Sequence, residues 1–289
     1  MQIPGDTLDN DLPQISISLR AANEIIKGSA ISFSKFEQTV SKDLKSASKN
    51  IKGRSLNLIA SVKSRIIKTR NVLAILPGEN TDSIVVVGGH YDHVGMRQGY
   101  IWNGSDDNAS GTVGVMAIAR AFAESGIKPE KTMVFAAWTG EEKGLLGSEY
   151  FVNHSDYSSK NIMLNLNYDM ISRNADDDSA GVECSMVYTK AYANFKDIAE
   201  KNNESYKLAL KIDYRASDKP SGGSDHAPFA AKNIPVMYFM AGFHEDYHQP
   251  GDTIEKADIH KMTSIIKLGY LNLWDVVNGN FEHISAASK

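Results

Sequence analysis

The chain has 289 residues, of which 42% are hydrophobic and 23% charged, a balance typical of a globular protein with one large domain or two smaller ones. Its net charge of −4 argues against electrostatic binding to nucleic acid or to an anionic membrane. No apolar run is long enough to cross a bilayer, and the polar first residues do not form a signal peptide. The single cysteine, Cys184, excludes an intrachain disulfide and a zinc site built on thiolates.

The first 70 residues differ from the rest in being rich in Lys and Ser. Their only strong apolar alternations are Ile15–Ile17 and Leu56–Ile59–Val62. These alternations predict a small β-containing appendage.

From Asn71 onward, short β-branched runs bounded by Gly, Pro and Asn predict buried strands at 71–77, 83–89, 131–138, 161–170 and 234–240. Helices are expected at 144–153 and from Ser110, a plausible N-cap, to a stop at Gly126. A long amphipathic helix closes the chain, with an apolar face of Ile259, Met262, Ile266, Leu273 and Val277. This alternation predicts an α/β three-layer sandwich, with a central mostly parallel mixed sheet and helices on both faces.

Polar clusters follow four of the predicted strands: His90-Tyr91-Asp92, Gly140-Glu141-Glu142, Asp169, and the segment His244–His248. A fifth cluster, Ser105–Asn108, immediately precedes a helix. In open α/β sheets the ligand site lies at the carboxyl ends of the strands, so the fold gathers these groups at one edge.

Five carboxylates and two histidines gathered without Lys or Arg would repel one another, and divalent metal is the simplest remedy. Imidazole and carboxylate without thiolate suit zinc, with Co²⁺ or Mn²⁺ as alternatives. One metal needs only three protein ligands, so the set is large enough for two ions with one shared carboxylate. Taken singly, the clusters have ordinary readings, since Asp106-Asp107-Asn108 can cap a helix and Glu141-Glu142 can form a solvated turn.

The segments GGHYDH, NGSDDNASG, WTGEEKGLLGS, NYDM, GSDHAPF and YHQPGDT resemble, in order, the motifs of the co-catalytic two-zinc aminopeptidases of the bacterial leucyl aminopeptidase type. Glutamate carboxypeptidase, glutaminyl cyclase and the transferrin-receptor ectodomain share that fold. The resemblance covers roughly residues 70 to 280.

The resemblance implies a set of five metal ligands: His90 and Asp169 on one zinc, Glu142 and His248 on the other, and Asp107 between them. Glu141 would be the general base for a water held between the metals, and Asp92 would accept the other ring N–H of His90. The Asp107–Asn108 peptide bond would be cis. His244 competes with His248 for the last position, but the following Pro-Gly-Asp-Thr matches the family at His248.

The expected activity is zinc-dependent removal of the N-terminal residue from peptides with a free N-terminus. Met170 follows the predicted ligand Asp169, Tyr247 precedes His248, and Phe243 lies in the same loop as Tyr247. These three residues are expected to form an apolar pocket for the first side chain. The alternatives are a carboxypeptidase or dipeptidase, for which Arg97 and Arg215 in expected loops are candidate cations, a glutaminyl cyclase, and a non-catalytic binding protein.

The remaining histidines and the N-terminal segment give less specific predictions. His93, His154, His260 and His283 are interpreted as surface or helix histidines. The segment LPQISISLRAANEII resembles the closing part of a protease-associated domain, which divides the chain into an appendage at 1–55 and a peptidase domain at 56–289. The resemblance also favours export to the periplasm or the medium, with a signal peptide upstream of this chain, and leaves the oligomeric state open.

Overall fold

The computed structural model describes residues 15–44, 50, 51, 53, 55, 57, 59, 66–157 and 159–279. The chain divides into two units, with the boundary between Ile67 and Lys68. Among the described residues, none of the helices combines the length and the apolar character that a membrane span needs.

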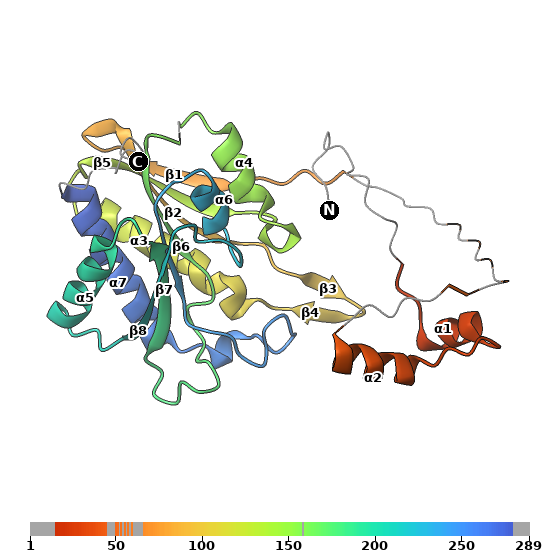
Figure 1. The fold of residues 1–289 in the computed structure, drawn as a ribbon. Helices are drawn as coiled ribbons and strands as arrows, with labels where there is room; N and C mark the ends of the chain where they lie inside the picture. Colours follow the sequence, from red (N-terminus) through yellow and green to blue (C-terminus); the bar gives the residue numbers. More distant parts are fainter. Residues whose placement is uncertain are drawn as a thin grey trace. The chain divides into compact units, whose positions relative to one another are not determined.

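The second unit is built on a mixed sheet, in which the strand order is β1-β5-β2-β6-β9-β7-β8 (Figure 1). The four middle strands run parallel, while β1 is antiparallel to β5 and β7 is antiparallel to β9. The strands are β1 (Val72–Leu76), β2 (Asn80–His90), β5 (Lys131–Trp138), β6 (Ile162–Tyr168), β7 (Glu183–Thr189), β8 (Lys211–Ser217) and β9 (Val236–Met240). A separate hairpin pairs β3 (Gly95–Arg97) with β4 (Tyr100–Trp102).

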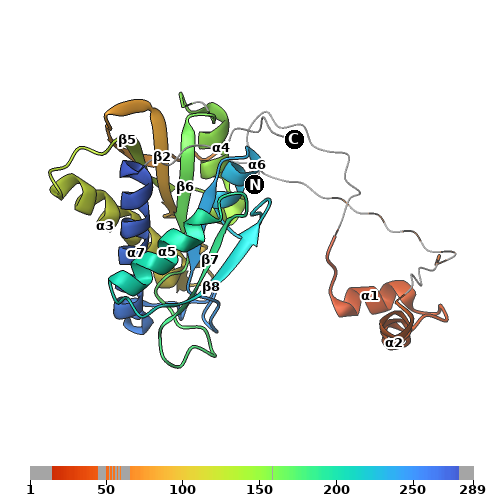
Figure 2. The same cartoon turned by 60° about the vertical axis from the view of Figure 1, so that its left-hand side comes forward.

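Helices cover both faces of the sheet, so its central strands are buried on both sides. In β2, Val85 and Val87 join the apolar cluster that includes α3, α5 and α7, while Ile84 and Val86 join the cluster that includes α4 and α6. Figures 1 and 2 show these two helical layers on opposite sides of the strands. The helices are α3 (Gly111–Glu124), α4 (Leu146–His154), α5 (Asn194–Ser205), α6 (His226–Ala231) and α7 (Ile259–Asn278). The predicted three-layer α/β sandwich is confirmed.

Every strand and helix expected after Asn71 is present, within a few residues of its expected ends. Gly126, with φ +69°, ends α3 as predicted. Among the described residues of this unit, six strands and α-helices were not foreseen: β3, β4, β7, β8, α5 and α6. In β7, buried residues alternate with half-buried polar ones such as Glu183 and Ser185, so the segment lacks the apolar run that marked the central strands.

In the first unit the described residues form two helices, α1 (Leu19–Ile26) and α2 (Phe33–Asp43). The expectation of a strand at Ile15–Ile17 is wrong, because this segment lies outside any strand. Ser18 and Ser32 cap the two helices by accepting main-chain N–H groups, and such caps favour helix over the weak apolar alternation. Leu56 and Val62 of the other expected strand lie outside the described residues.

Candidate active site

The carboxyl ends of the central strands bring the expected site residues together. His90 is the last residue of β2, and Asp169 follows the last residue of β6. These strands are parallel neighbours in register, with Gly88 opposite Asn167, so their ends reach the same edge of the sheet. His90 also lies opposite Trp138, the end of β5, after which the chain turns into the short helix η2 (Glu141–Lys143).

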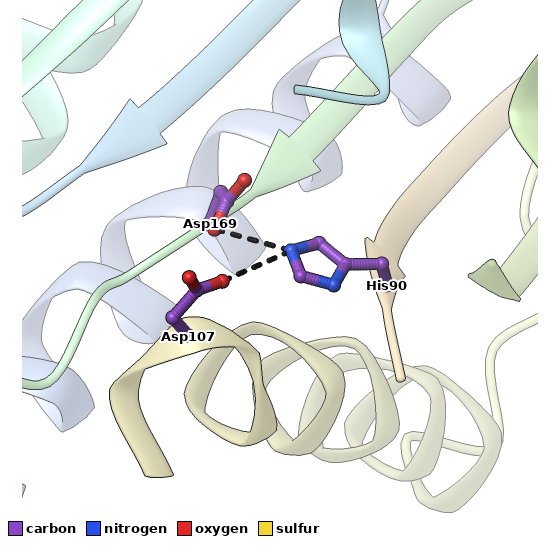
Figure 3. Close-up of side chains that lie close together, drawn as sticks. All are labelled: His90, Asp107 and Asp169. Atoms are coloured by element: carbon purple, nitrogen blue, oxygen red, sulfur yellow. Dashed lines mark ion pairs between the residues drawn. The ribbon is translucent and has the colours of Figure 1, made fainter. Parts of the chain in front are cut away.

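The first group of side chains is centred on His90, which is almost completely buried. Its Nε2 lies 3.3 Å from Oδ1 of Asp107 and 3.5 Å from Oδ1 of Asp169 (Figure 3). The ring Nδ1 donates a hydrogen bond to the main-chain carbonyl of Asp92 at 3.0 Å. Because this bond uses the Nδ1 proton, the lone pair of the neutral ring is on Nε2 and faces the two carboxylates.

The second group is centred on Glu142 in η2. Its Oε2 lies 3.2 Å from Nε2 of His248, and its Oε1 lies 2.9 Å from Nδ1 of His93. His248 comes from the loop after β9, where its carbonyl accepts a hydrogen bond from the indole of Trp102 at 3.0 Å. The rings of His93 and His248 meet edge to face, with their centroids 5.8 Å apart.

Asp107 joins the two groups through its two carboxylate oxygens. Oδ1 faces His90, while Oδ2 lies 3.0 Å from Nε2 of His248. Asp107 belongs to the irregular turn η1 (Ser105–Ser110), and the Asp107–Asn108 peptide bond is cis, as the resemblance implied. The main-chain N–H of Asp107 donates to the carboxylate of Asp252 at 3.1 Å, so the segment that follows His248 also holds this turn.

The neighbouring carboxylate, Asp106, faces away from both groups. Its Oδ1 accepts hydrogen bonds from the main chain and hydroxyl of Ser172, and its Oδ2 lies 3.2 Å from Nε2 of His244. His244 is therefore engaged with Asp106, whereas His248 lies against Asp107 and Glu142. Of the two histidines that competed for one ligand position, the structure brings His248 to the group.

The donor atoms of both groups are suited to a divalent cation. His90 with Asp107 and Asp169, and His93 with Asp107 and Glu142, each offer ligand atoms that lie within 4.8 Å of one another. Nε2 of His90 and Oδ1 of Asp169 are buried without an aligned hydrogen-bond partner among the described residues. Buried polar atoms without a hydrogen-bond partner destabilise the fold unless a ligand binds them. A set of nitrogen and oxygen donors without thiolate is suited to zinc.

The charge balance of the site also favours a cation. Burial lowers the pKa of His90, but its contacts with Asp107 and Asp169 outweigh burial and hold that pKa well above its ordinary value. Burial, together with the charges of Asp169, Asp225 and Glu142, raises the pKa of Glu141 to about 8, against the opposing effect of His90. The carboxylates gathered around these two side chains raise the pKa of both.

Glu141 and Asp92 lie beside the first group. Oε2 of Glu141 is 3.9 Å from Nε2 of His90, so this carboxylate borders the group without closer contact. The carboxylate of Asp92 accepts the main-chain N–H of Glu141 at 3.1 Å and lies 3.9 Å from the His90 ring. The main-chain carbonyl of Asp92, not its carboxylate, accepts the ring N–H, while the carboxylate positions Glu141.

The three residues expected to form the substrate pocket have different surroundings. Met170 is only 3% exposed and has a φ of +56°. Phe243 is 59% exposed and stacks edge to face on Tyr247, whose ring lies against that of His248. Tyr247 and Phe243 thus border the second group from the loop side.

One site residue was missed from the sequence. His93 was interpreted as a surface histidine, but only 10% of its side chain is exposed and it contacts Glu142. Its position after the end of a strand, within HYDH, was the available signal. His154 and His260 are exposed on α4 and α7 as expected, and His283 lies outside the described residues.

Comparison with known proteins agrees with this fold. The chain belongs to Peptidase family M28, whose model matches residues 71–269. It is 32% identical over 175 residues to leupeptin-inactivating enzyme 1 of Streptomyces exfoliatus, covering 60% of this chain and 36% of that protein. It is 28% identical over 235 residues to leucine aminopeptidase 2 of Trichophyton rubrum, covering 72% of this chain and 44% of that protein. The chain thus spans less than half of these relatives.

Solved structures share the fold. BSAP, a zinc aminopeptidase from Bacillus subtilis, is 25% identical with a TM-score of 0.61, over 76% of this chain and 51% of that one. LapA of Legionella pneumophila is 22% identical with a TM-score of 0.62, over 85% of this chain and 64% of that one, and shows the fold alone.

Proposed function

We propose that the chain is the catalytic part of a zinc-dependent aminopeptidase, which hydrolyses the N-terminal bond of peptides with a free N-terminus. The observation that carries this proposal is the divided carboxylate of Asp107, with one oxygen on the His90 side and the other on the His248 side. A carboxylate suits the space between two cations because each oxygen can bind one of them. The zinc aminopeptidase BSAP, which has the same fold, supports the same activity.

Five residues would hold two zinc ions: His90 and Asp169 on one side, Glu142 and His248 on the other, and Asp107 between them. When bound, divalent ions polarise a scissile carbonyl and lower the pKa of water. Co²⁺ or Mn²⁺ are alternatives with the same donor atoms.

Glu141 would serve as the general base. Its carboxylate borders the His90 group, with Oε2 3.9 Å from Nε2 of His90, so it can accept a proton from the attacking water and give it to the leaving amine. Asp92 fixes the main chain of Glu141 and, through its carbonyl, the ring of His90. The base and one ligand are thus oriented by one residue.

Met170, Phe243 and Tyr247 are the proposed walls of the pocket for the first side chain. All three are uncharged. Met170 and Tyr247 adjoin ligand positions and Phe243 packs on Tyr247, so the pocket should favour Leu, Met or Phe. An unpaired substrate carboxylate would lose hydration there without compensation.

The alternatives within the fold have less support. A carboxypeptidase or dipeptidase needs a cation for the terminal carboxylate. The two arginines expected in loops lie in strands instead, with Arg97 in β3 and Arg215 in β8, an edge strand where Arg215 is paired with Asp213 at 2.6 Å. A glutaminyl cyclase would, by resemblance, go with an incomplete ligand set, and a non-catalytic binding protein with lost ligands. Here all five positions carry a suitable side chain.

The test is a panel of aminoacyl-anilides assayed with added zinc and after chelation. Leu-anilide should be cleaved only with metal, and its N-acetyl derivative should be resistant because the free amine is blocked. Cleavage of N-blocked dipeptides instead would favour the carboxypeptidase alternative, and cyclisation of N-terminal glutaminyl peptides would favour the cyclase.

For the N-terminal unit we propose a protease-associated-like appendage at 1–55, with the peptidase domain at 56–289. The described residues of that appendage include the helices α1 and α2. Export of the chain stays a prediction of the resemblance.

A further inference from the structure

His93 is built into the site. Its ring is nine-tenths buried, and its Nδ1 lies 2.9 Å from Glu142 and 4.0 Å from Oδ2 of Asp107. Together His93, Asp107 and Glu142 offer three ligand atoms that lie within 4.8 Å of one another. The rings of His93 and His248 therefore both face the carboxylate of Glu142 and Oδ2 of Asp107.

The backbone around His93 leaves room for this ring. A Cβ added at Gly104 would lie 2.6 Å from Cγ and 2.8 Å from Cδ2 of His93, which is closer than side chains approach. Gly104 also has a φ of +65°, the left-handed region that glycine adopts most readily. Any larger residue in place of Gly104, just before η1, would therefore push its side chain against His93.

The contact between His93 and Glu142 is short but is not an aligned hydrogen bond. Both ring nitrogens of His93 and Oε1 of Glu142 are buried without a hydrogen-bond partner among the described residues. Nε2 of His90 and Oδ1 of Asp169 show the same combination of close approach and poor alignment. Such geometry is expected when nitrogen and oxygen lone pairs point at a common point between them, where a cation would sit.

We infer that His93 is a further protein ligand of the divalent ion beside Glu142, an inference that rests on the proposed metal centre. The ligands of that ion are then four: Asp107, Glu142, His93 and His248. The other ion has three, namely His90, Asp107 and Asp169. Since zinc with four protein ligands is enclosed and zinc with three keeps an open position, the two sites differ in character. The ion beside Glu142 is the one held more tightly.

The competing explanation is that His93 only orients Glu142 through a hydrogen bond. The two roles differ in their response to asparagine, whose amide can donate a hydrogen bond but is a poor zinc ligand. They also differ in the number of imidazoles bound to metal.

The experiment is zinc titration of the chelator-stripped full chain against a chromophoric chelator, in the wild type, His93→Ala, His93→Asn and the exposed-histidine control His260→Ala. The wild type and the control should bind two ions. Both His93 variants should bind one ion as before and the other at least about 100-fold more weakly, beyond the loss of about 10–100-fold typical for a residue that merely supports a ligand.

X-ray absorption of the zinc-loaded wild type gives an independent count. Three imidazoles shared between two ions support the inference, and two imidazoles overturn it, whether or not the variants fold. Wild-type affinity in His93→Ala, or recovery of affinity in His93→Asn, would also overturn it. If the wild type itself binds fewer than two ions with zinc in excess, the proposed metal centre fails, which is a different result from a failure of His93 alone.

Discussion

The two halves of the site share Asp107 but are held in different ways. On one side, His90 and Asp169 come from the ends of β2 and β6 in the middle of the sheet, and their side chains are 1% and 7% exposed. On the other side, His248 lies in a loop, is 37% exposed, and is tied down by Trp102 of the β3–β4 hairpin. The sheet itself thus positions the first half, while hydrogen bonds between loops position the second.

This difference has a consequence for function. Parallel strands buried on both faces have little freedom, so the His90 half should keep its geometry when surface residues change. The loop half can adapt, and it carries Tyr247 and Phe243, the exposed walls of the proposed pocket. Substitutions can therefore be chosen to affect both halves, neither, or one.

The largest effect is expected for Asp107→Ala, which removes the one side chain common to both halves. Both ions should bind far more weakly, and activity should fall by roughly 10⁴-fold or more, the order seen when a catalytic set is dismantled. Metal content and the rate on Leu-anilide measure this. The matched control is the neighbouring buried carboxylate, as Asp106→Asn, which should lower thermal stability more than metal content because Asp106 binds Ser172 and His244. Retention of one tightly bound ion in Asp107→Ala would contradict the bridging role.

Glu141→Gln should lower the catalytic rate without weakening metal binding in either half of the site. The amide cannot accept the proton of the attacking water, so kcat should fall about 10²–10⁴-fold while both ions stay bound. Glu142→Gln is the comparison variant, since it should weaken the ion beside His248. The roles are interchanged if Glu141→Gln loses metal and Glu142→Gln keeps it.

Where strands end, the sequence predicted which side chains lie close together. His90 and Asp169 were placed together because the carboxyl ends of parallel strands meet at one edge, which is a property of the topology. His248 was chosen over His244 by motif, and the structure shows the physical difference, which is the contact of His244 with Asp106.

The features that the sequence did not predict lie in loops and in half-buried strands and helices. The inward position of His93 depends on the space left by Gly104, eleven residues later, and no local pattern contains it. The conformation of the same loop also decides that the carbonyl of Asp92 accepts the His90 ring N–H, while its carboxylate accepts the main-chain N–H of Glu141. In the fold, α5 and β8 were missed because their apolar stripes are interrupted by polar residues on the exposed side.

Substrate specificity should show how much the buried residue Met170 and the exposed residue Phe243 each contribute to the pocket. Leu- and Met-anilides are expected well ahead of Glu-anilide in kcat/KM, because a carboxylate has no partner there. Phe243→Ala should lower the preference for Leu by about tenfold, within the range that one or two apolar groups contribute to discrimination. Met170→Ala should also change it, with thermal stability measured alongside because Met170 is buried. A preference for acidic or basic first residues would contradict the assignment of the pocket. If Met170→Ala has the same order of kcat/KM values across the anilides as the wild type, Met170 is not part of the pocket.

The smallest effect is expected for Trp102→Phe, which acts on the loop half alone. The substitution keeps an aromatic ring in the hairpin but removes the indole N–H that donates to the carbonyl of His248. A hydrogen bond of this kind contributes about 1 kcal/mol, so the ion beside Glu142 should bind about fivefold more weakly. The ion beside His90 should be unaffected, because pairing between β2 and β6 positions the ends of those strands, whereas Trp102 bonds to His248.

Zinc titration with the chelator resolves the two ions in this variant, and Tyr100→Phe, an exposed position in the same hairpin, is the control. An equal loss at both ions would mean that the hairpin stabilises the whole site and that the two halves are not independently held. No loss at either would mean that the loop keeps His248 in place through other contacts, such as the hydrogen bond from Asn103 to the carbonyl of Pro250 at 2.7 Å. The double variant with Asn103→Ala then shows how much of the loop half depends on the hairpin.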